Sequence, residues 1–429
     1  MKYRGVAATL AMTMGLVLAS SPGVSADPGQ WQGPQTVDDT YAGGLLAVVA
    51  NASGVFAVWS DGRFEVAHRK AGPGVVWSEP QPLAGSGNAL LEDGPVMALP
   101  SGAAVVFATV AAAERTLMWR VSDDGSPGPR RVLPFDSFTP EVADRAADGR
   151  WLVAGTRQGA PGPAHLAVRN SSGSWRVSQR LPLGLVELVG AWFDREGVPH
   201  VMVTSARSSG GSRPISEVRL RPDGSWSPPR QLGTAGGSNS TVLANTDGDV
   251  TLAYSHWVTP SNLATIVRTR PSGGTWSAPL RFRQDSPAMA IDDLGRTFII
   301  RAGREVFAGR ISAEGSLLNG WQQLTGSTFD NDYLGRQNLT SGADGVAVVG
   351  VVGETTSTEG TTRVERYWRC SPGEECVEVG EFDLGPDNTG QSLASGPAGS
   401  VYALNSAGPP CESDQGLCSW RLPAPSATP

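Results

Sequence analysis

Several segments that we expect to be surface loops carry residue types that bind ligands. His256 and Trp257 lie together in a Ser-His-Trp segment, and Tyr333 ends a Phe-Asp-Asn-Asp-Tyr segment. An aromatic ring beside polar groups can stack on a sugar ring while its neighbours bond to the hydroxyl groups. We therefore expect a sugar platform at these three residues. The full set of candidate ligand-binding residues is Trp59, Asp61, Arg157, His256, Trp257, Asp330, Asp332 and Tyr333.

The two aspartates of the Phe-Asp-Asn-Asp-Tyr segment could instead bind Ca²⁺, because hard cations take clustered carboxylates. Asp330 and Asp332 lack the alternating Asp spacing and the distal Glu of a recognised calcium loop. Ordinary loop polarity is the other interpretation of all these residues. We expect no cofactor, and calcium is the one ion left open.

Motifs of common enzyme classes are absent from the sequence. It contains no GxSxG, HExxH, P-loop or dinucleotide-binding GxGxxG context. Carboxylates for glycoside hydrolysis could still converge in space from distant segments. We therefore expect a protein without catalysis, and a glycosidase-type hydrolase if it is an enzyme. Each of the four histidines falls in a different repeat: His68, His165, His200 and His256.

Composition and the N-terminus indicate an exported protein. The formal net charge is −7, and no basic face that would bind nucleic acid is visible. Lys2 and Arg4 precede the apolar run 6–19, and the small residues Val24 and Ala26 fit a signal-peptidase site. The run is too short for a membrane span. We expect a signal peptide at 1–26, one domain at 27–423, a disordered tail at 424–429, and a secreted monomer.

Glycine-containing turns divide the chain into regular repeats. They occur at intervals of 47 to 54 residues, and each precedes an apolar run. The repeats read as four short strands each, except that the last repeat ends after its third strand. The third strand carries an arginine, and the fourth resembles the segment 223–232, DGSWSPPRQL. Prolines in that segment fit an outer edge strand, where a missing N–H is tolerated. The turn glycines are Gly54, Gly102, Gly149, Gly197, Gly248, Gly295, Gly345 and Gly399.

Four antiparallel strands in each repeat predict an all-β fold, the β-propeller. The eighth repeat ends after its third strand, but the segment around Trp31 resembles the missing fourth strand. We therefore expect eight four-stranded blades, closed by the N-terminal strand; seven blades is the alternative. The fourth-strand tryptophans should pack between blades, and the third-strand arginines should be solvated edge residues.

The four cysteines fall into two close pairs. Cys370 is six residues from Cys376, and Cys411 is seven from Cys418. Export favours disulfides, and these spacings suit local bridges across loops of the last two blades. Zinc is the alternative, but CxxC-type spacing with nearby histidines is absent. We expect two disulfides within these pairs.

The turn before the fourth strand resembles the Asp-box of bacterial-neuraminidase (BNR) repeats, S-x-D-x-G-x-T-W. The segment 268–276, RTRPSGGTW, keeps Gly273, Thr275 and Trp276, but its aspartate is missing. The resemblance covers the repeats from about residue 31 to 423 and implies a sialidase-like or lectin-like propeller. Sialidases hold their substrate with three arginines and use a Tyr–Glu pair and an aspartate. No R-I-P segment or Tyr–Glu motif of that kind occurs here.

These patterns predict a secreted propeller that binds an extracellular ligand, either a glycan or another cell-surface component. A sialidase-like hydrolase or lyase and a protein-interaction scaffold are the alternatives. The ligand should meet the face formed by the second-to-third and fourth-to-first connections, because a rigid scaffold positions functional loops.

Overall fold

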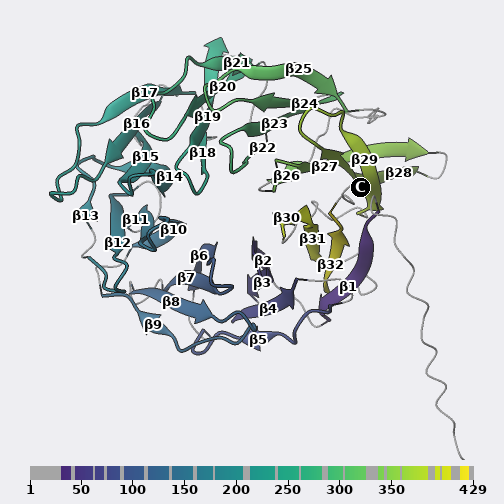
Figure 1. Cartoon of the computed structure of the whole chain (residues 1–429), viewed down its shortest axis with the longest axis horizontal. Helices are drawn as coiled ribbons and strands as arrows, with labels where there is room; N and C mark the ends of the chain where they lie inside the picture. Colours follow the sequence, from purple (N-terminus) through teal and green to yellow (C-terminus); the bar gives the residue numbers. More distant parts are fainter. Residues whose placement is uncertain are drawn as a thin grey trace, which may run out of the picture.

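The computed structural model consists of short antiparallel strands arranged in a ring (Figure 1). Its described part contains eight four-stranded sheets and no α-helix, and no helix there could cross a membrane. The described residues are 30–39, 44–60, 63–71, 75–86, 91–110, 115–134, 138–157, 162–176, 179–205, 213–236, 240–259, 262–282, 288–302, 305–324, 337–342, 345–357, 360–384, 392–396, 399–406 and 416–424.

Each sheet is one blade, and its strands follow one another from the axis outward. Blade 1 contains β2 (Gly44–Asn51), β3 (Gly54–Ser60), β4 (Phe64–Lys70) and β5 (Gln81–Pro82). Blade 2 contains β6 (Leu91–Ala98), β7 (Ala104–Val110), β8 (Arg115–Val121) and β9 (Arg131–Val132). Blade 3 contains β10 (Thr139–Arg145), β11 (Trp151–Thr156), β12 (Ala164–Arg169) and β13 (Gln179–Arg180). Blade 4 contains β14 (Val186–Phe193), β15 (Pro199–Ser205), β16 (Arg213–Arg219) and β17 (Arg230–Ala235).

The second half of the ring repeats this arrangement. Blade 5 contains β18 (Ser240–Ala244), β19 (Val250–Thr259), β20 (Asn262–Arg270) and β21 (Leu280–Phe282). Blade 6 contains β22 (Ala288–Ile291), β23 (Thr297–Ala302), β24 (Val306–Ile311) and β25 (Leu317–Gln323). Blade 7 contains β26 (Gln337–Ser341), β27 (Ala347–Ser357), β28 (Gly360–Cys370) and β29 (Val377–Asp383). Blade 8 contains β30 (Ser392–Ser395), β31 (Val401–Ser406), β32 (Leu417–Leu422) and β1 (Gln32–Asp38).

The N-terminal strand closes the ring. Strand β1 pairs antiparallel with β32, so that Gln35 lies opposite Ser419 and Thr36 opposite Cys418. In Figure 1 the purple N-terminal strand accordingly lies beside the yellow C-terminal blade. Eight blades and closure by the N-terminal strand are therefore confirmed, and the seven-bladed alternative is wrong.

Because the strands of a blade alternate in direction, their connections separate onto two faces. The first-to-second and third-to-fourth turns share one face, which we call the turn face; the other connections form the loop face. Most turn glycines have positive φ, for example Gly102 at 89° and Gly248 at 82°, a conformation that side chains rarely allow. Gly102 also lies against Ser53 of the preceding blade, so these turns pack on one another around the ring.

The hydrophobic core lies mainly between neighbouring blades. Trp77 and Trp276, from the segments expected as fourth strands, are 7% and 6% exposed and pack against the preceding blade. Trp77 Nε1 donates a 2.6 Å hydrogen bond to Ser419 Oγ of blade 8. The expected packing of tryptophans between blades is therefore found at both positions.

The arginines of the third strands differ from the expectation of solvated edge residues. Arg69, Arg270 and Arg369 are all less than 9% exposed. Arg69 Nη1 donates a 2.7 Å hydrogen bond to Tyr402 Oη across the closure between blades 1 and 8. The expectation was wrong for these three because a neighbouring blade covers each of them. Arg69 and Arg270 bond to the preceding blade, and Arg369 bonds to blade 8, the next one.

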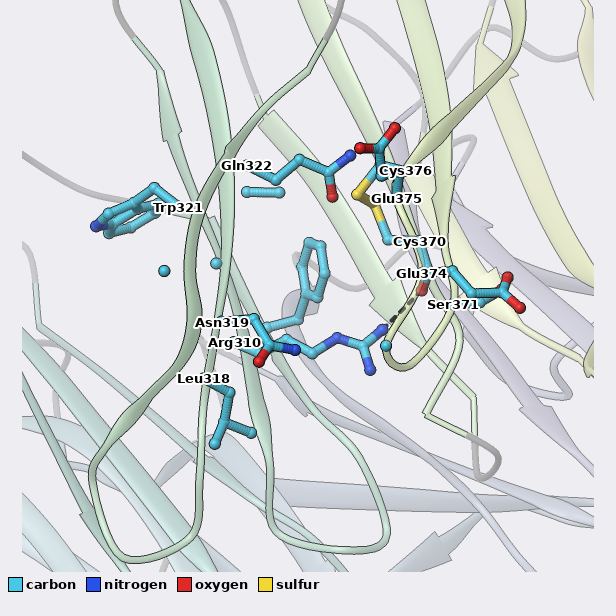
Figure 2. Close-up of a pocket in the computed structure, with 15 residues that line it drawn as sticks. Arg310, Leu318, Asn319, Trp321, Gln322, Cys370, Ser371, Glu374, Glu375 and Cys376 are labelled. Carbon is cyan, nitrogen blue, oxygen red and sulfur yellow. Dashed lines mark hydrogen bonds between the residues drawn. A yellow bond between two sulfur atoms is a disulfide. The ribbon is translucent and has the colours of Figure 1, made fainter.

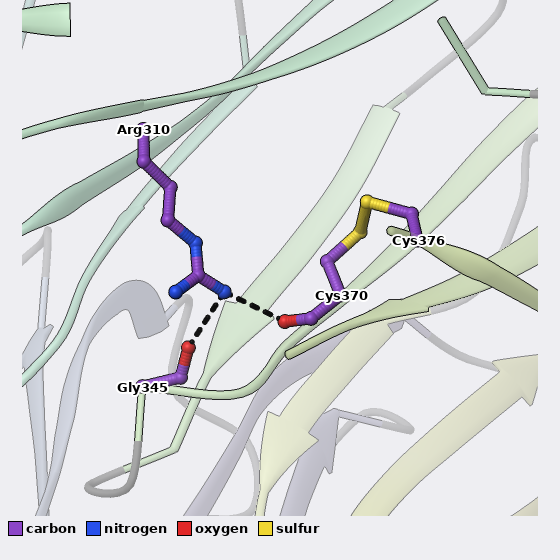
Figure 3. Close-up of a disulfide and its surroundings, with 4 residues drawn as sticks. All are labelled: Arg310, Gly345, Cys370 and Cys376. Carbon is purple, nitrogen blue, oxygen red and sulfur yellow. Dashed lines mark hydrogen bonds between the residues drawn. A yellow bond between two sulfur atoms is a disulfide. The ribbon is translucent and has the colours of Figure 1, made fainter. Parts of the chain in front are cut away.

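The predicted disulfide between Cys370 and Cys376 is present, with an S–S distance of 2.02 Å (Figure 3). It closes the turn between β28 and β29 in blade 7. Cys418 is also disulfide-bonded, whereas Cys411, its predicted partner, lies outside the described residues.

Candidate functional site

A cavity of about 760 Å³ lies where the first-to-second turns converge around the axis. Its volume falls within the range of small-molecule sites, roughly 300–1,000 Å³. Every blade except blade 4 contributes to its lining, which mixes apolar, backbone and charged groups. Its side chains include those of Met97, Leu99, Asp144, Arg145 and Asp293.

Asp144 and Arg145 enter this axial cavity from the end of β10, the inner strand of blade 3. Asp144 Oδ2 accepts a 2.8 Å hydrogen bond from the backbone N–H of Phe193 in blade 4. Burial raises the pKa of Asp144 to about 6, although this hydrogen bond and the charge of Arg145 act in the opposite direction. A carboxyl group with such a pKa can exchange a proton near neutral pH.

Asp293 enters the axial cavity from the turn that follows β22 in blade 6. Burial raises its pKa, and the negative charges of Asp247 and Asp292 add to the effect. The carboxylate of Asp292 is already bonded within the turn. Its Oδ1 accepts a hydrogen bond from the backbone N–H of Leu294, and its Oδ2 forms an ion pair with Arg296 Nε at 2.8 Å. Asp293 is therefore the aspartate of this pair that lines the cavity.

Further carboxyl groups lie on the inner strands of blades 3 and 4. Burial raises the pKa of Glu141, with a contribution from the charge of Glu187, while hydrogen bonds from Thr156 oppose the shift. Glu187 Oε2 pairs with Arg213 Nη1 at 2.5 Å. Both glutamates thus have protein partners, unlike the carboxylate of Asp293, for which the described residues show none.

Those candidate residues from the sequence that the structure describes, Trp59, Arg157, His256 and Trp257, lie toward the loop face and do not line this cavity. Trp59, at the end of β3, is fully buried and donates from Nε1 to Glu65 Oε2 at 3.2 Å. Its expected position in an exposed loop is therefore corrected: the indole packs in the core between blades 1 and 8. Asp61 lies outside the described residues.

Arg157, His256 and Trp257 lie at the loop-face ends of their strands. Arg157 is exposed directly after β11. His256 Nδ1 lies 3.0 Å from Thr234 O of β17, and Trp257 is 38% exposed on the β19–β20 hairpin. A Cβ on Gly236 would lie 2.2 Å from the Trp257 ring, so the glycine makes room for the indole. His256 and Trp257 therefore adjoin, as predicted, but their ligand role stays a prediction.

The Phe-Asp-Asn-Asp-Tyr segment, with Asp330, Asp332 and Tyr333, lies outside the described residues. Its proposed pairing with Trp257 and its calcium alternative therefore stay predictions. Within the described ranges, no group of three or more His, Cys, Asp or Glu side chains is placed to hold a metal ion.

Sequence reasoning missed the axial cavity because it assigned function to the loop face. A usable signal was present in the repeats. Aspartates lie at or just after the ends of the inner strands, in the segments ADR at 143–145 and IDD at 291–293. In register, these positions fall at the axial ends of blades 3 and 6.

Comparisons with known proteins support the fold and leave the function open. No family model and no curated protein match the chain, so the Asp-box resemblance stays a prediction. An ulvan lyase of polysaccharide lyase family PL25 is 10% identical to this chain, with a TM-score of 0.50. The match covers 91% of this chain and 95% of the lyase. A puromycin hydrolase has 15% identity and a TM-score of 0.49, covering 88% of this chain; this chain spans 61% of that protein. The propeller domain of the Pyrococcus furiosus Trilobed protease is 8% identical to this chain, with a TM-score of 0.43. The match covers 88% of this chain and 93% of that domain.

Proposed function

We propose that this chain is a secreted protein that binds a glycan in the axial cavity. The observation that carries the proposal is the presence of Asp144, Arg145 and Asp293 in one cavity of about 760 Å³. Vicinal sugar hydroxyls donate to carboxylates and accept from a guanidinium group, so these three residues suit a polyol. Met97 and Leu99 offer apolar surface to the C–H groups of a sugar ring.

The net charge of the three residues favours a neutral or amino sugar over an acidic one. Two carboxylates face one arginine, and Asp247 and Asp292 add negative charge near Asp293. A uronic acid or sialic acid would bring a further negative charge into this environment.

A glycan array probed with the purified mature chain tests this proposal. We expect neutral or amino sugars to bind, and Asp144→Asn and Asp293→Asn each to weaken binding of the array hit at least about tenfold in calorimetry. Trp257→Ala is the matched control, since Trp257 lies on the opposite face. An empty array, or a hit that only Trp257→Ala weakens, would refute the axial site.

A glycoside hydrolase or lyase is the second candidate. The same observation favours it, because two carboxyl groups with raised pKa values and an arginine line one cavity. Incubating the array hit with the protein and measuring new reducing ends and unsaturated sugars would separate binding from cleavage. Product formed at the same rate by Asp144→Asn as by the wild type would exclude Asp144 as the acid or base.

A further inference from the structure

A second cavity, of about 430 Å³, lies between blades 6 and 7 (Figure 2). It shares no lining residue with the axial cavity. One wall comes from β24 and β25 of blade 6, and the other from the turn closed by the disulfide in blade 7. The lining residues that matter here are Phe298, Arg310, Leu318, Asn319, Gln322 and Ser371.

An irregularity in β25 widens the blade 6 wall. Arg310 lies opposite Leu318 and Gly309 opposite Trp321, so Asn319 and Gly320 have no partner on β24. Both residues have positive φ, 56° and 72°. Such bulges redirect side chains and are common next to binding sites. Here the two extra residues form part of the cavity wall.

Arg310 is the charged group of this inter-blade cavity. Its Nη2 donates to Gly345 O at 3.0 Å and to Cys370 O at 2.7 Å (Figure 3), which ties blade 6 to blade 7. Among the described residues, Nε and Nη1 have no hydrogen-bond partner, and no carboxylate forms an ion pair with Arg310. Three N–H groups of a guanidinium therefore remain available.

The surrounding charges do not neutralise Arg310. Burial lowers its pKa, and the positive charge of Arg296 lowers it further, while Asp292 acts in the opposite direction but is already paired with Arg296. Glu374 and Glu375 lie exposed at the rim. Figure 2 shows the Glu374 carboxylate pointing away from the guanidinium. A partly buried cation without a counter-ion favours an anionic ligand.

We propose that the inter-blade cavity binds a small organic carboxylate with an apolar or aromatic body. The carboxylate accepts hydrogen bonds from Arg310, and the amides of Asn319 and Gln322 supply further donors at the wall. The body of the ligand covers Phe298 and Leu318, which line the same space. This site goes beyond the proposed glycan site, since it is lined by other residues and has the opposite charge preference.

Ligand-observed NMR with phenylacetate as the probe and 2-phenylethanol as its neutral analogue tests the site. We expect phenylacetate to bind the full chain at least about tenfold more tightly than the alcohol, because a charge-assisted hydrogen bond is lost with the carboxylate. Arg310→Gln should reduce phenylacetate binding by a similar factor. Arg131→Gln, at an exposed arginine of blade 2, is the matched control and should change nothing.

Leu318→Trp provides a second variant that fills the cavity and leaves Arg310 and its carbonyl partners in place. It should abolish binding of the probe, and it decides the question if Arg310→Gln does not fold. Arg145→Gln should retain binding, which separates this site from the axial cavity. The proposal is overturned if phenylacetate does not bind, if the alcohol binds equally well, or if Leu318→Trp binds as the wild type does.

Discussion

The indole Nε1 of Trp276 donates a 2.9 Å hydrogen bond to Glu217 Oε2, and this bond joins blade 5 to blade 4. Glu217 Oε1 also accepts from Arg270 of blade 5 at 2.5 Å and lies 2.8 Å from His200 Nδ1 of blade 4. Burial alone would raise the pKa of Glu217, but the bond from His200, the charge of Arg270 and the bond from Trp276 lower it to about 2. One buried carboxylate thus holds two blades together.

Replacing Glu217 by glutamine should destabilise the ring. Arg270 would keep its buried charge without a carboxylate, and breaking a buried pair costs about 3 kcal/mol or more. Urea unfolding followed by tryptophan fluorescence would measure the loss. Glu314→Gln, at an exposed glutamate in a turn of blade 6, is the control and should leave the midpoint unchanged. Equal midpoints for the Glu217→Gln variant and the wild type would contradict the role of this carboxylate.

Asp144 should make stability depend on pH in the acid range. Its pKa is about 6 in the folded chain against an ordinary value of 3.8, so the folded state holds the proton more tightly. The protonated Asp144 carboxyl group therefore contributes stability that is fully present below about pH 3.8 and is lost as the pH rises through about 6. Asp144→Asn keeps an acceptor for the Phe193 N–H without the buried charge. We expect it to be more stable than the wild type at pH 7, by on the order of 1–3 kcal/mol.

That difference between Asp144→Asn and the wild type should shrink as the pH falls from about 6 to about 4. Urea midpoints of both proteins across this range would show it. A variant that is less stable than the wild type at pH 7, or a difference that does not change with pH, would argue against the buried charge. Reduced glycan binding together with higher stability would indicate that Asp144 is retained for function.

Removing the Cys370–Cys376 disulfide should weaken blade 7 moderately. The bridge spans six residues, and closing a loop of that length stabilises by about 2 kcal/mol in the chain-entropy estimate. The double variant Cys370→Ser, Cys376→Ser should therefore unfold at a lower temperature in calorimetry. The single replacement Ser371→Ala, within the same turn, is the control. An unchanged unfolding temperature in the double variant would show that the bridge adds no stability.

Deleting residues 30–39 should open the ring. The deletion removes β1, which pairs with β32, and it removes the buried side chain of Val37. We expect a loss of about 2–5 kcal/mol, as for other losses of large core groups, and faster amide exchange in β32. A synthetic peptide of residues 30–39 should restore protection. Deletion of residues 425–429 is the comparison, and equal exchange in both truncations would refute closure by β1.

The fold could be predicted because its signals are local and repeated. The turn glycines mark positions where the backbone adopts a positive φ. These turns recur at a nearly constant interval, with short strands between them. The unmatched copy around Trp31 identified the closing strand, and short spacing identified the bridge between Cys370 and Cys376. Each of these features depends on residues that lie close together in the sequence or on how often a motif recurs. Both can be read directly from a single sequence.

The sites could not be predicted in this way. Asp144 and Asp293 come from blades three positions apart, and they line one cavity only because the ring brings the ends of the inner strands together. Trp59 looked like a loop residue by position, but the neighbouring blade covers it. The sequence by itself determined the blades and their closure, since backbone geometry and strand pairing follow local patterns. Tertiary structure decided which charges share a cavity, since burial and proximity arise only when the blades pack.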